Sequence, residues 1–258
     1  GLVGDRRAAG DVAAVILEPT GASWGTIPLR SEFLRDLREL TEKHHVVLIF
    51  DEVVTGFRVS PGGAQARYGV TPDLTSLAKI LAGGMPGGAV CGRRDIISMI
   101  EFRDGRWNAE QRVQHPGTFN ANPVSSAAGT AMLEMVQTGD HHLHAGALNE
   151  ALIRGLNAVI GDLGVAGCAY GLASYFHIAF GAGLTPLGNG IEWVGAGAPP
   201  RISGEAVGGL KRGMLNHGID LMGGSGGFVS GVHTQQDIDA TLVAFRETLG
   251  QMRAEGFV

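Results

Sequence analysis

The sequence predicts an α/β fold, with parallel strands first and a smaller α+β region after them. Two short, wholly apolar runs, 12–17 and 46–50, have the length and composition of strands that are buried on both faces. Between them, apolar side chains recur at helical spacing, which gives the order strand, helix, strand. Such a crossover joins neighbouring parallel strands in a right-handed sense.

The remaining elements follow in chain order. The first strand ends at Glu18-Pro19, and the helix begins near Ser31, a residue type that can cap a helix. Residues 73–78 and 88–92 are further strand candidates, separated by the glycine-rich turn 83–87. Asn122-Pro123 opens a helix to about residue 136, and a second helix is expected over 143–163.

Strand-like stretches at 173–180 and 227–232, with helices over 205–217 and 236–252, describe the smaller region. We therefore predict two domains. Residues 1–140 form the end of a large domain, and residues 141–258 form an interdomain helix and a small domain.

Composition excludes several classes of partner. The 258 residues are 44% hydrophobic, enough for a real core, and the net charge of −5 offers no basic stripe for nucleic acid. No apolar run approaches the roughly 20 residues of a membrane span, and the start of the chain does not resemble a secretory signal. We expect no membrane partner and a cytoplasmic location.

Cysteine and histidine patterns give no sign of a metal site. The two cysteines, Cys91 and Cys168, are far apart in sequence and are expected to be small buried residues. Three histidines crowd together at 141, 142 and 144, but no acid or cysteine is clearly spaced to complete a ligand set.

Asp51 and Lys79 are the first candidates for chemistry, because open α/β sheets bind ligands beyond the carboxyl ends of their strands. Asp51 follows the apolar run 46–50, where taken alone it could simply anchor a loop or cap a helix. Lys79 has apolar neighbours, and we expect them to shield it from water. Shielding favours the neutral amine, the form that attacks a carbonyl to make a Schiff base.

Four motifs resemble, in order and spacing, the class III aminotransferases of pyridoxal-phosphate fold type I. They are Glu18-Pro19; Phe50-Asp51-Glu52-Val53-Val54-Thr55-Gly56-Phe57-Arg58; Ser76-Leu77-Ala78-Lys79 with Gly83-Gly84-Met85-Pro86-Gly87-Gly88; and Gly117-Thr118-Phe119-Asn120-Ala121-Asn122-Pro123. Within that family the chain looks most like the glutamate-1-semialdehyde 2,1-aminomutases, through Gly62-Gly63-Ala64-Gln65-Ala66, Tyr68-Gly69-Val70-Thr71-Pro72-Asp73-Leu74 and Phe228-Val229-Ser230 with His233-Thr234.

The resemblance implies the cofactor pyridoxal 5′-phosphate and a role for each matched residue. Lys79 would bind the cofactor covalently as a Schiff base and move the proton between the substrate α-carbon and the cofactor. Asp51 would keep the pyridine nitrogen protonated, and Val53 would pack on the face of the ring. Thr118 would contact the phosphate in the partner subunit, which implies a homodimer with shared sites. Glu18 would lie near the pocket of a small amino or keto substrate.

The resemblance also implies an incomplete large domain. Members of the family carry, before the Glu-Pro strand, a stretch that supplies the phosphate-binding turn and several strands. The sequence starts at that strand, so we expect a truncated chain with an unpaired sheet edge, exposed apolar surface and a tendency to aggregate.

Three functions remain open at this point. The first is a pyridoxal-phosphate-dependent transaminase or aminomutase. A nicotinamide oxidoreductase shares the α/β layout but needs a Gly-x-Gly-x-x-Gly turn after its first strand, where this chain has Glu18-Pro19. The third is a catalytically silent fragment that associates with a relative. Between transaminase and aminomutase, Ser225-Gly226-Gly227 stands where the aminomutases tend to carry Phe-Glu-Ala.

Overall fold

The computed structural model describes residues 12–29, 31–187, 190–193 and 203–258. Contacts divide the chain into two compact units. The first runs to Trp24 and resumes over Leu29–Thr138, and the second comprises Gly25–Pro28 and Gly139–Val258. The boundary of contacts falls between Thr138 and Gly139, while the assignment of 1–140 and 141–258 as domains stays a prediction.

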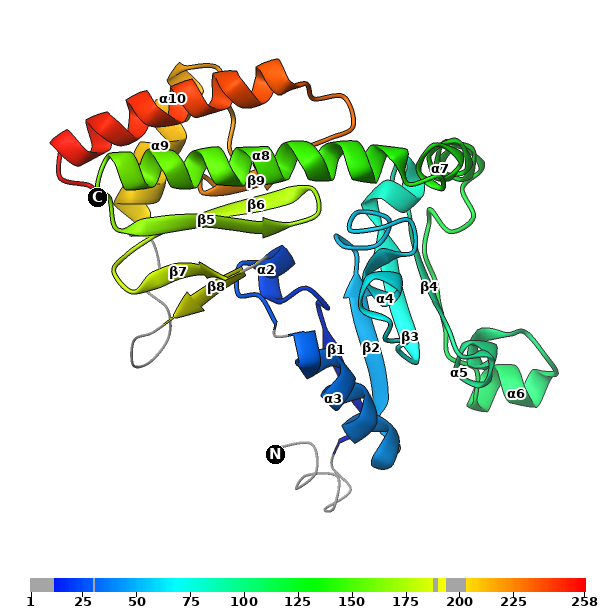
Figure 1. Cartoon of the computed structure of the whole chain (residues 1–258). Helices are drawn as coiled ribbons and strands as arrows, with labels where there is room; N and C mark the ends of the chain where they lie inside the picture. The colour runs from blue at the N-terminus through cyan, green and yellow to red at the C-terminus, as the bar shows by residue number, and fades with distance from the viewer. Residues whose placement is uncertain (1–11, 30, 188–189, 194–202) are drawn as a thin grey trace. The chain divides into compact units, whose positions relative to one another are not determined.

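The first unit is built on a four-stranded sheet in the order β1-β2-β3-β4 (Figure 1). Its strands are β1 (Ala14–Leu17), β2 (Val47–Glu52), β3 (Leu74–Ala78) and β4 (Gly88–Gly92). The first three are parallel, and β4 is antiparallel to β3. The predicted α/β class and mostly parallel sheet are confirmed.

Helix α3 (Ser31–Lys43) covers one face of this sheet because its apolar residues lie on one side. Leu34 and Leu37 of the helix pack against Leu48 and Phe50 of β2, and all four are buried. Burial of side chains of this size contributes about 1.5–3 kcal/mol each. The α3–β2 contact is thus the apolar core beneath the candidate site.

Side chains of β2 alternate between the two faces of the sheet, as in any strand. Leu48, Phe50 and Glu52 are buried, whereas Ile49 and Asp51 on the other face are half-buried. The neighbouring acids Asp51 and Glu52 therefore point to opposite faces.

Short elements connect the strands of the first unit: α2 (Ala22–Gly25), α4 (Gly63–Tyr68), η1 (Lys79–Ala82), α5 (Arg94–Ile97), η2 (Ser98–Ile100) and α6 (Gly105–Glu110). The unit closes with helix α7 (Pro123–Val136), where Asn122 caps the backbone N–H groups of Val124 and Ser125. Helix α7 packs on η1, and a Cβ at Gly129 would lie only 2.4 Å from the carbonyl oxygen of Leu81. Only glycine permits this close approach.

An ion network ties α3 to the amino-terminal end of β3. The Asp73 carboxylate accepts hydrogen bonds from the Leu48 N–H and from the guanidinium groups of Arg38 (2.9 Å) and Arg93 (3.0 Å). Burial alone would raise the pKa of Asp73, but these hydrogen bonds outweigh it and hold the pKa below its ordinary value.

Asp73→Asn is expected to lower the free energy of unfolding by about 2–3 kcal/mol at pH 7, because a charged acceptor of three hydrogen bonds is lost. A carboxyl with a lowered folded-state pKa contributes stability above its unfolded pKa, near 3.9, and loses it as pH falls through the folded pKa. The difference between wild type and Asp73→Asn should therefore shrink below about pH 4. Urea denaturation at pH 7, 5 and 3 measures it, and a difference that is constant across this range would contradict the assignment.

Strands β1 and β4 are the outer strands of the sheet within the described ranges. Ile16 on β1 and Val90 on β4 are 64% and 49% exposed, as the expected unpaired edge and apolar surface require. Cys91 is also exposed, so the prediction that it is buried was wrong. Its strand is exposed along its whole length, and apolar neighbours in the sequence do not reveal this. Cys168 is buried as predicted, and burial raises the pKa of its thiol to about 11.

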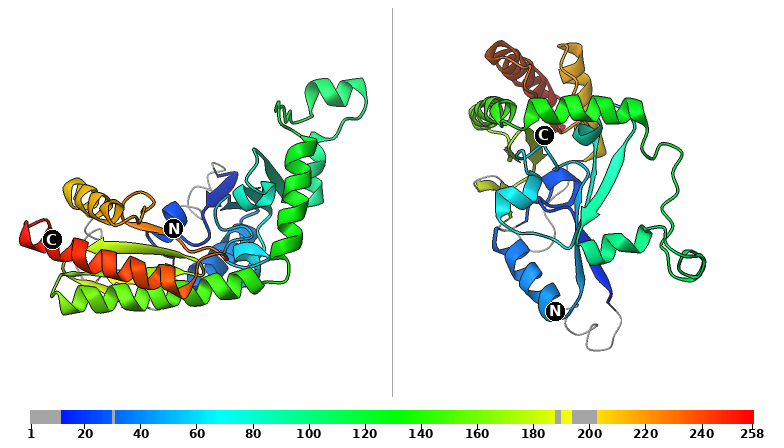
Figure 2. Two further views of the ribbon diagram at one scale, coloured as in Figure 1. Left: turned by 90° about the horizontal axis from the view of Figure 1, so that it is seen from above. Right: turned by 90° about the vertical axis from the view of Figure 1, so that its right-hand side faces the viewer.

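The second unit contains a three-stranded antiparallel sheet, in the order β5-β6-β9, and a separate hairpin. Its elements are β5 (Gly167–Leu172), β6 (Tyr175–Phe180), the hairpin β7 (Leu184–Leu187) with β8 (Gly190–Trp193), α9 (Gly204–Asn216), β9 (Gly226–Phe228), and the long helices α8 (Asp140–Asp162) and α10 (Gln235–Ala254). The last two lie side by side (Figure 2). Leu156, Leu210 and Phe245, one from each of the three helices, meet in the core.

Two searches of the described residues were negative. None of the helices in these ranges is both long enough and apolar enough to cross a lipid bilayer. Nor do three or more histidine, cysteine or acidic side chains gather in these ranges in a way that could hold a metal ion.

Candidate active site

Asp51 lies near the carboxyl end of β2 and uses one carboxylate oxygen to hold the local backbone. Its Oδ1 accepts a hydrogen bond from the Val53 N–H at 3.1 Å and another from the Ser76 hydroxyl at 3.2 Å. The first is a local Asx-type turn, so Asp51 does anchor the segment after the strand. Within the described residues Oδ2 accepts no hydrogen bond, and this oxygen is available to a ligand.

Lys79 follows directly after β3, as the first residue of η1. Its backbone is left-handed, with φ of +53°. The side chain is exposed and has no hydrogen-bond or ion-pair partner among the described residues. The predicted shielding by apolar neighbours was therefore wrong, because Ile80 and Leu81 belong to a tight turn that directs them away from the lysine side chain's full coverage.

Asp51 and Lys79 share one edge of the sheet. Strands β2 and β3 are parallel neighbours, and Asp51 lies opposite Ser76, three residues before Lys79. The carboxyl ends of adjacent parallel strands are where open α/β sheets bind ligands. This edge presents an unbonded carboxylate oxygen and an unpartnered ammonium group within the described part of the chain.

The left-handed backbone at Lys79 predicts an unusual order of stabilities. An L-residue in this conformation costs about 1–2 kcal/mol, which glycine avoids, although glycine loses more entropy on folding. Lys79→Gly should therefore be about 0.5–1 kcal/mol more stable than Lys79→Ala. At the next position, which lacks a positive φ, Ile80→Gly should be less stable than Ile80→Ala. Thermal unfolding of the four variants checks this, and the same order at both positions would refute the strain.

The described contacts of Val53 and Glu18 are with the protein itself. Val53 is half-buried and donates its N–H to Asp51, and its packing on a cofactor ring stays a prediction. Glu18 receives the N–H groups of Ser23 at 2.8 Å and Trp24 at 2.7 Å, one on each carboxylate oxygen. These bonds hold the turn after β1, and a role of Glu18 towards substrate stays a prediction.

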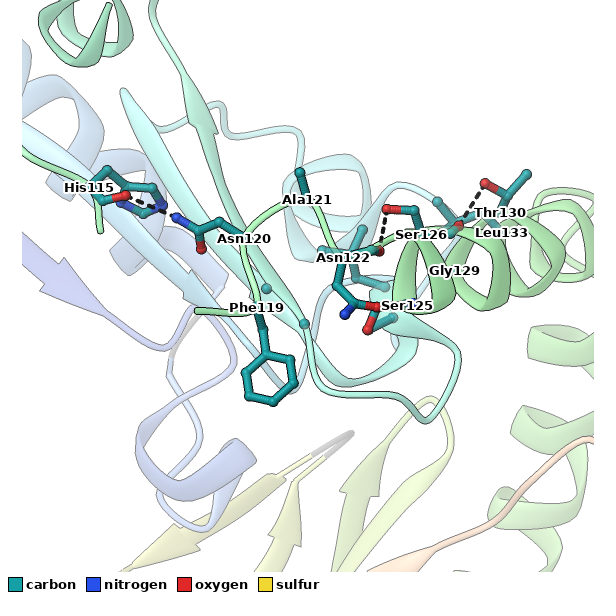
Figure 3. A pocket seen from close by; sticks show the side chains of 14 residues that line it. His115, Phe119, Asn120, Ala121, Asn122, Ser125, Ser126, Gly129, Thr130 and Leu133 are labelled. Atoms are coloured by element: carbon teal, nitrogen blue, oxygen red, sulfur yellow. Dashed lines mark hydrogen bonds between the residues drawn. The ribbon is translucent and has the colours of Figure 1, made fainter. Parts of the chain in front are cut away.

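Thr118 stands apart from this group. It is exposed, in a turn closed by the hydrogen bonds Asn120 N–H to Gly117 and Asn122 N–H to Phe119, and its own side chain has no partner among the described residues. Beside the turn lies a cavity of about 490 Å³, drawn in Figure 3. Its walls come from η1, the start of β4, the turn and α7, and neither Asp51 nor Lys79 lines it. The role of Thr118 at a partner's phosphate stays a prediction.

The structure adds a buried acid that motif reasoning did not single out. Glu52 is 1% exposed, and its carboxylate accepts hydrogen bonds from the Ala64 N–H (2.6 Å), the Gln65 N–H and amide, and the Thr55 hydroxyl. Gln65 also donates to Thr75 of β3. Glu52 thus fastens the first turn of α4 to the sheet, and strand alternation next to Asp51 was the signal that could have found it.

Comparison with known proteins agrees with this geometry. Residues 3–163, more than half of the chain, match the class III aminotransferase family. The chain belongs to this family.

Solved structures of similar proteins span nearly the whole chain. An omega-transaminase from Sphaerobacter thermophilus is 30% identical with a TM-score of 0.80, over 98% of this chain and 54% of that one. A β-phenylalanine aminotransferase from Variovorax paradoxus is 29% identical, with a TM-score of 0.77, over 98% and 56%. A glutamate-1-semialdehyde-aminomutase from Pseudomonas aeruginosa PAO1 is 27% identical, with a TM-score of 0.78, over 96% and 54%. The chain spans about half the length of these proteins.

Proposed function

We propose that this protein is a pyridoxal-phosphate-dependent enzyme that transfers an amino group, as a transaminase or an aminomutase. The observation that carries the proposal is the shared sheet edge, where Asp51 Oδ2 and the Lys79 ammonium group have no partner in the described residues. A cofactor with a basic ring nitrogen and an aldehyde matches this donor set, because the carboxylate suits the nitrogen and the amine suits the aldehyde. The residues present therefore fit pyridoxal phosphate.

Each residue would do a separate task. When bound, the cofactor supplies an electron sink for the substrate's α-carbon. Lys79 would attach the cofactor covalently and carry the proton removed from the α-carbon. Asp51 would hold a proton on the ring nitrogen through its charge. Val53 would limit the movement of the ring by packing against it.

Covalent attachment at Lys79 is the direct test. In the protein expressed from its complete gene and loaded with pyridoxal phosphate, borohydride should fix the cofactor to Lys79. Trypsin does not cleave at a modified lysine, so residues 68–93 should appear as one peptide carrying the added mass. The other two lysines, Lys43 and Lys211, are internal controls that should stay unmodified. Lys79→Ala should lose the modification.

Failure of wild type to form this bond while it is folded would refute the proposal. It would favour the alternative that this is a catalytically silent fragment that associates with a relative.

Transaminase and aminomutase activities differ in where the amino group goes. We propose an aminomutase-like substrate, a small amino or keto acid similar to glutamate 1-semialdehyde, on the basis of the motifs over 62–74 and 228–234. Substrate labelled with ¹⁵N and mixed with an unlabelled keto acid separates the two activities. Label retained in the isomerised substrate identifies an aminomutase, whereas label in the added keto acid identifies a transaminase.

We also propose a homodimer in which Thr118 of one protomer serves the phosphate site of its partner. The exposed turn around Thr118, with Phe119 61% exposed, supports the proposal of a contact surface there. Mixing Thr118→Ala and Lys79→Ala proteins tests it, because shared sites would produce hybrid dimers with one doubly defective and one intact site. Recovery of activity on mixing is expected, and a strictly monomeric mass in solution would exclude it.

A further inference from the structure

We infer that Ser76 is a positioning residue for Asp51, which keeps one carboxylate oxygen on the protein and leaves the other for the cofactor's ring nitrogen. This inference rests on the proposed function, because it concerns the same site. It adds a residue from β3, the strand that leads to Lys79.

The hydrogen bonds of Asp51 are unevenly divided between its two oxygens. The Val53 N–H at 3.1 Å and the Ser76 hydroxyl at 3.2 Å both donate to Oδ1. Two donors on one oxygen, one from its own chain segment and one from the neighbouring strand, fix the plane of the carboxylate. With only the Val53 bond left, the group could turn about its side-chain bonds and exchange its oxygens.

Strand register places Ser76 at this position. Asp51 lies opposite Ser76 in the β2–β3 ladder, so their side chains leave the same face of the sheet. Thr75, one residue earlier, lies on the other face, where its hydroxyl accepts the Gln65 amide instead. The two adjacent hydroxyls of β3 therefore serve different acids. Ser76 serves Asp51, and Thr75 belongs to the network of Glu52.

The chemistry of this hydrogen bond favours a charged Asp51 beside a protonated ring. A hydrogen bond donated to a carboxylate stabilises its charged form, so the shared proton stays on the ring nitrogen rather than moving to Oδ2. Because Ser76 is three residues before Lys79 on β3, the same strand also positions the lysine that would hold the other end of the cofactor. Movement of β3 would shift both contacts together.

The test uses the protein from its complete gene, loaded with pyridoxal phosphate that carries ¹⁵N in its ring. The ¹⁵N resonance of the ring nitrogen reports its protonation. In Ser76→Ala this resonance should move towards the neutral-pyridine position, and the affinity for pyridoxal phosphate should fall about three- to tenfold, the loss expected for one hydrogen bond to a charged group. Ser76→Thr, which keeps the hydroxyl, should restore both values.

Two further variants separate positioning from a general effect on the strand. Thr75→Val removes the neighbouring hydroxyl from the opposite face and should leave the ¹⁵N resonance unchanged. Ser76→Cys retains a weaker donor of similar size and should give an intermediate shift, which secures the test if Ser76→Ala folds poorly. A ring resonance that is the same in wild type, Ser76→Ala and Ser76→Cys would overturn the inference, as would an equal shift in Thr75→Val.

The outcomes for Ser76 and for the proposed function are distinct. If borohydride fixes the cofactor to Lys79 but the Ser76 variants leave the ring resonance unchanged, only the positioning role fails. If wild type forms no bond to the cofactor, the proposed function fails first and the positioning role fails with it.

Discussion

Asp51→Asn is expected to lower kcat by about 10²–10³-fold, the cost of removing one preorganised electrostatic partner from an active site. Asparagine is nearly the same size, and its carbonyl oxygen can still accept the bonds from Val53 and Ser76. What it lacks is the negative charge that holds a proton on the ring nitrogen. Steady-state turnover with saturating cofactor measures the effect, once a substrate has been found.

The control for this variant is its stability. Since the Oδ1 contacts can be kept, Asp51→Asn should unfold within about 0.5 kcal/mol of wild type. A matched fall in both turnover and stability would make Asp51 a structural residue. Turnover within threefold of wild type would remove Asp51 from the catalytic machinery altogether.

Glu52→Ala is expected to have the opposite profile, with a loss of about 3–5 kcal/mol in the free energy of unfolding. The carboxylate is fully buried, so its removal leaves the Ala64 N–H and the Gln65 amide without their acceptor and opens a cavity. Since domains are commonly stable by only 5–15 kcal/mol, this is a large share of the total. Urea denaturation of the variant beside wild type measures it.

Glu52→Gln is the matched variant. Its carbonyl oxygen can keep one set of donors, but its amide group would face a second donor, either the Ala64 N–H or the Gln65 amide. We expect about half the loss seen for alanine. A cost below 1 kcal/mol for Glu52→Ala would mean that α4 is held to the sheet by packing, not by this carboxylate.

Parts of the fold could be predicted because their signals are local. The runs that form β1 and β2 are apolar throughout, and Asn122-Pro123 is a helix start that the structure reproduces as a cap. Strand β5 was missed because its glycines weaken the strand pattern, and β7 and β8 are only four residues each. Helix α8 begins at Asp140, three residues before the expected start at Leu143, because histidines near its start suggested a loop.

The candidate site was only partly open to sequence reasoning. Motifs singled out Asp51 and Lys79, and the β2–β3 pairing places them at one edge. The exposure of Lys79 depends on what lies across space from it, which neighbours in the sequence do not report. Ser76 and Gln65 could not be paired with Asp51 and Glu52 before the register was known, because a shift of one residue would pair them differently.

The alternation of Asp51 and Glu52 limits how the gene can change in length. One residue inserted or deleted within β2 would exchange the two acids, turning the shorter one into the interior and the longer one towards the ligand edge. Both tasks would fail at once, since Asp51 is too short to reach the donors of α4. Length changes in this strand should therefore survive only in steps of two, so that the strand has a reading frame of its own.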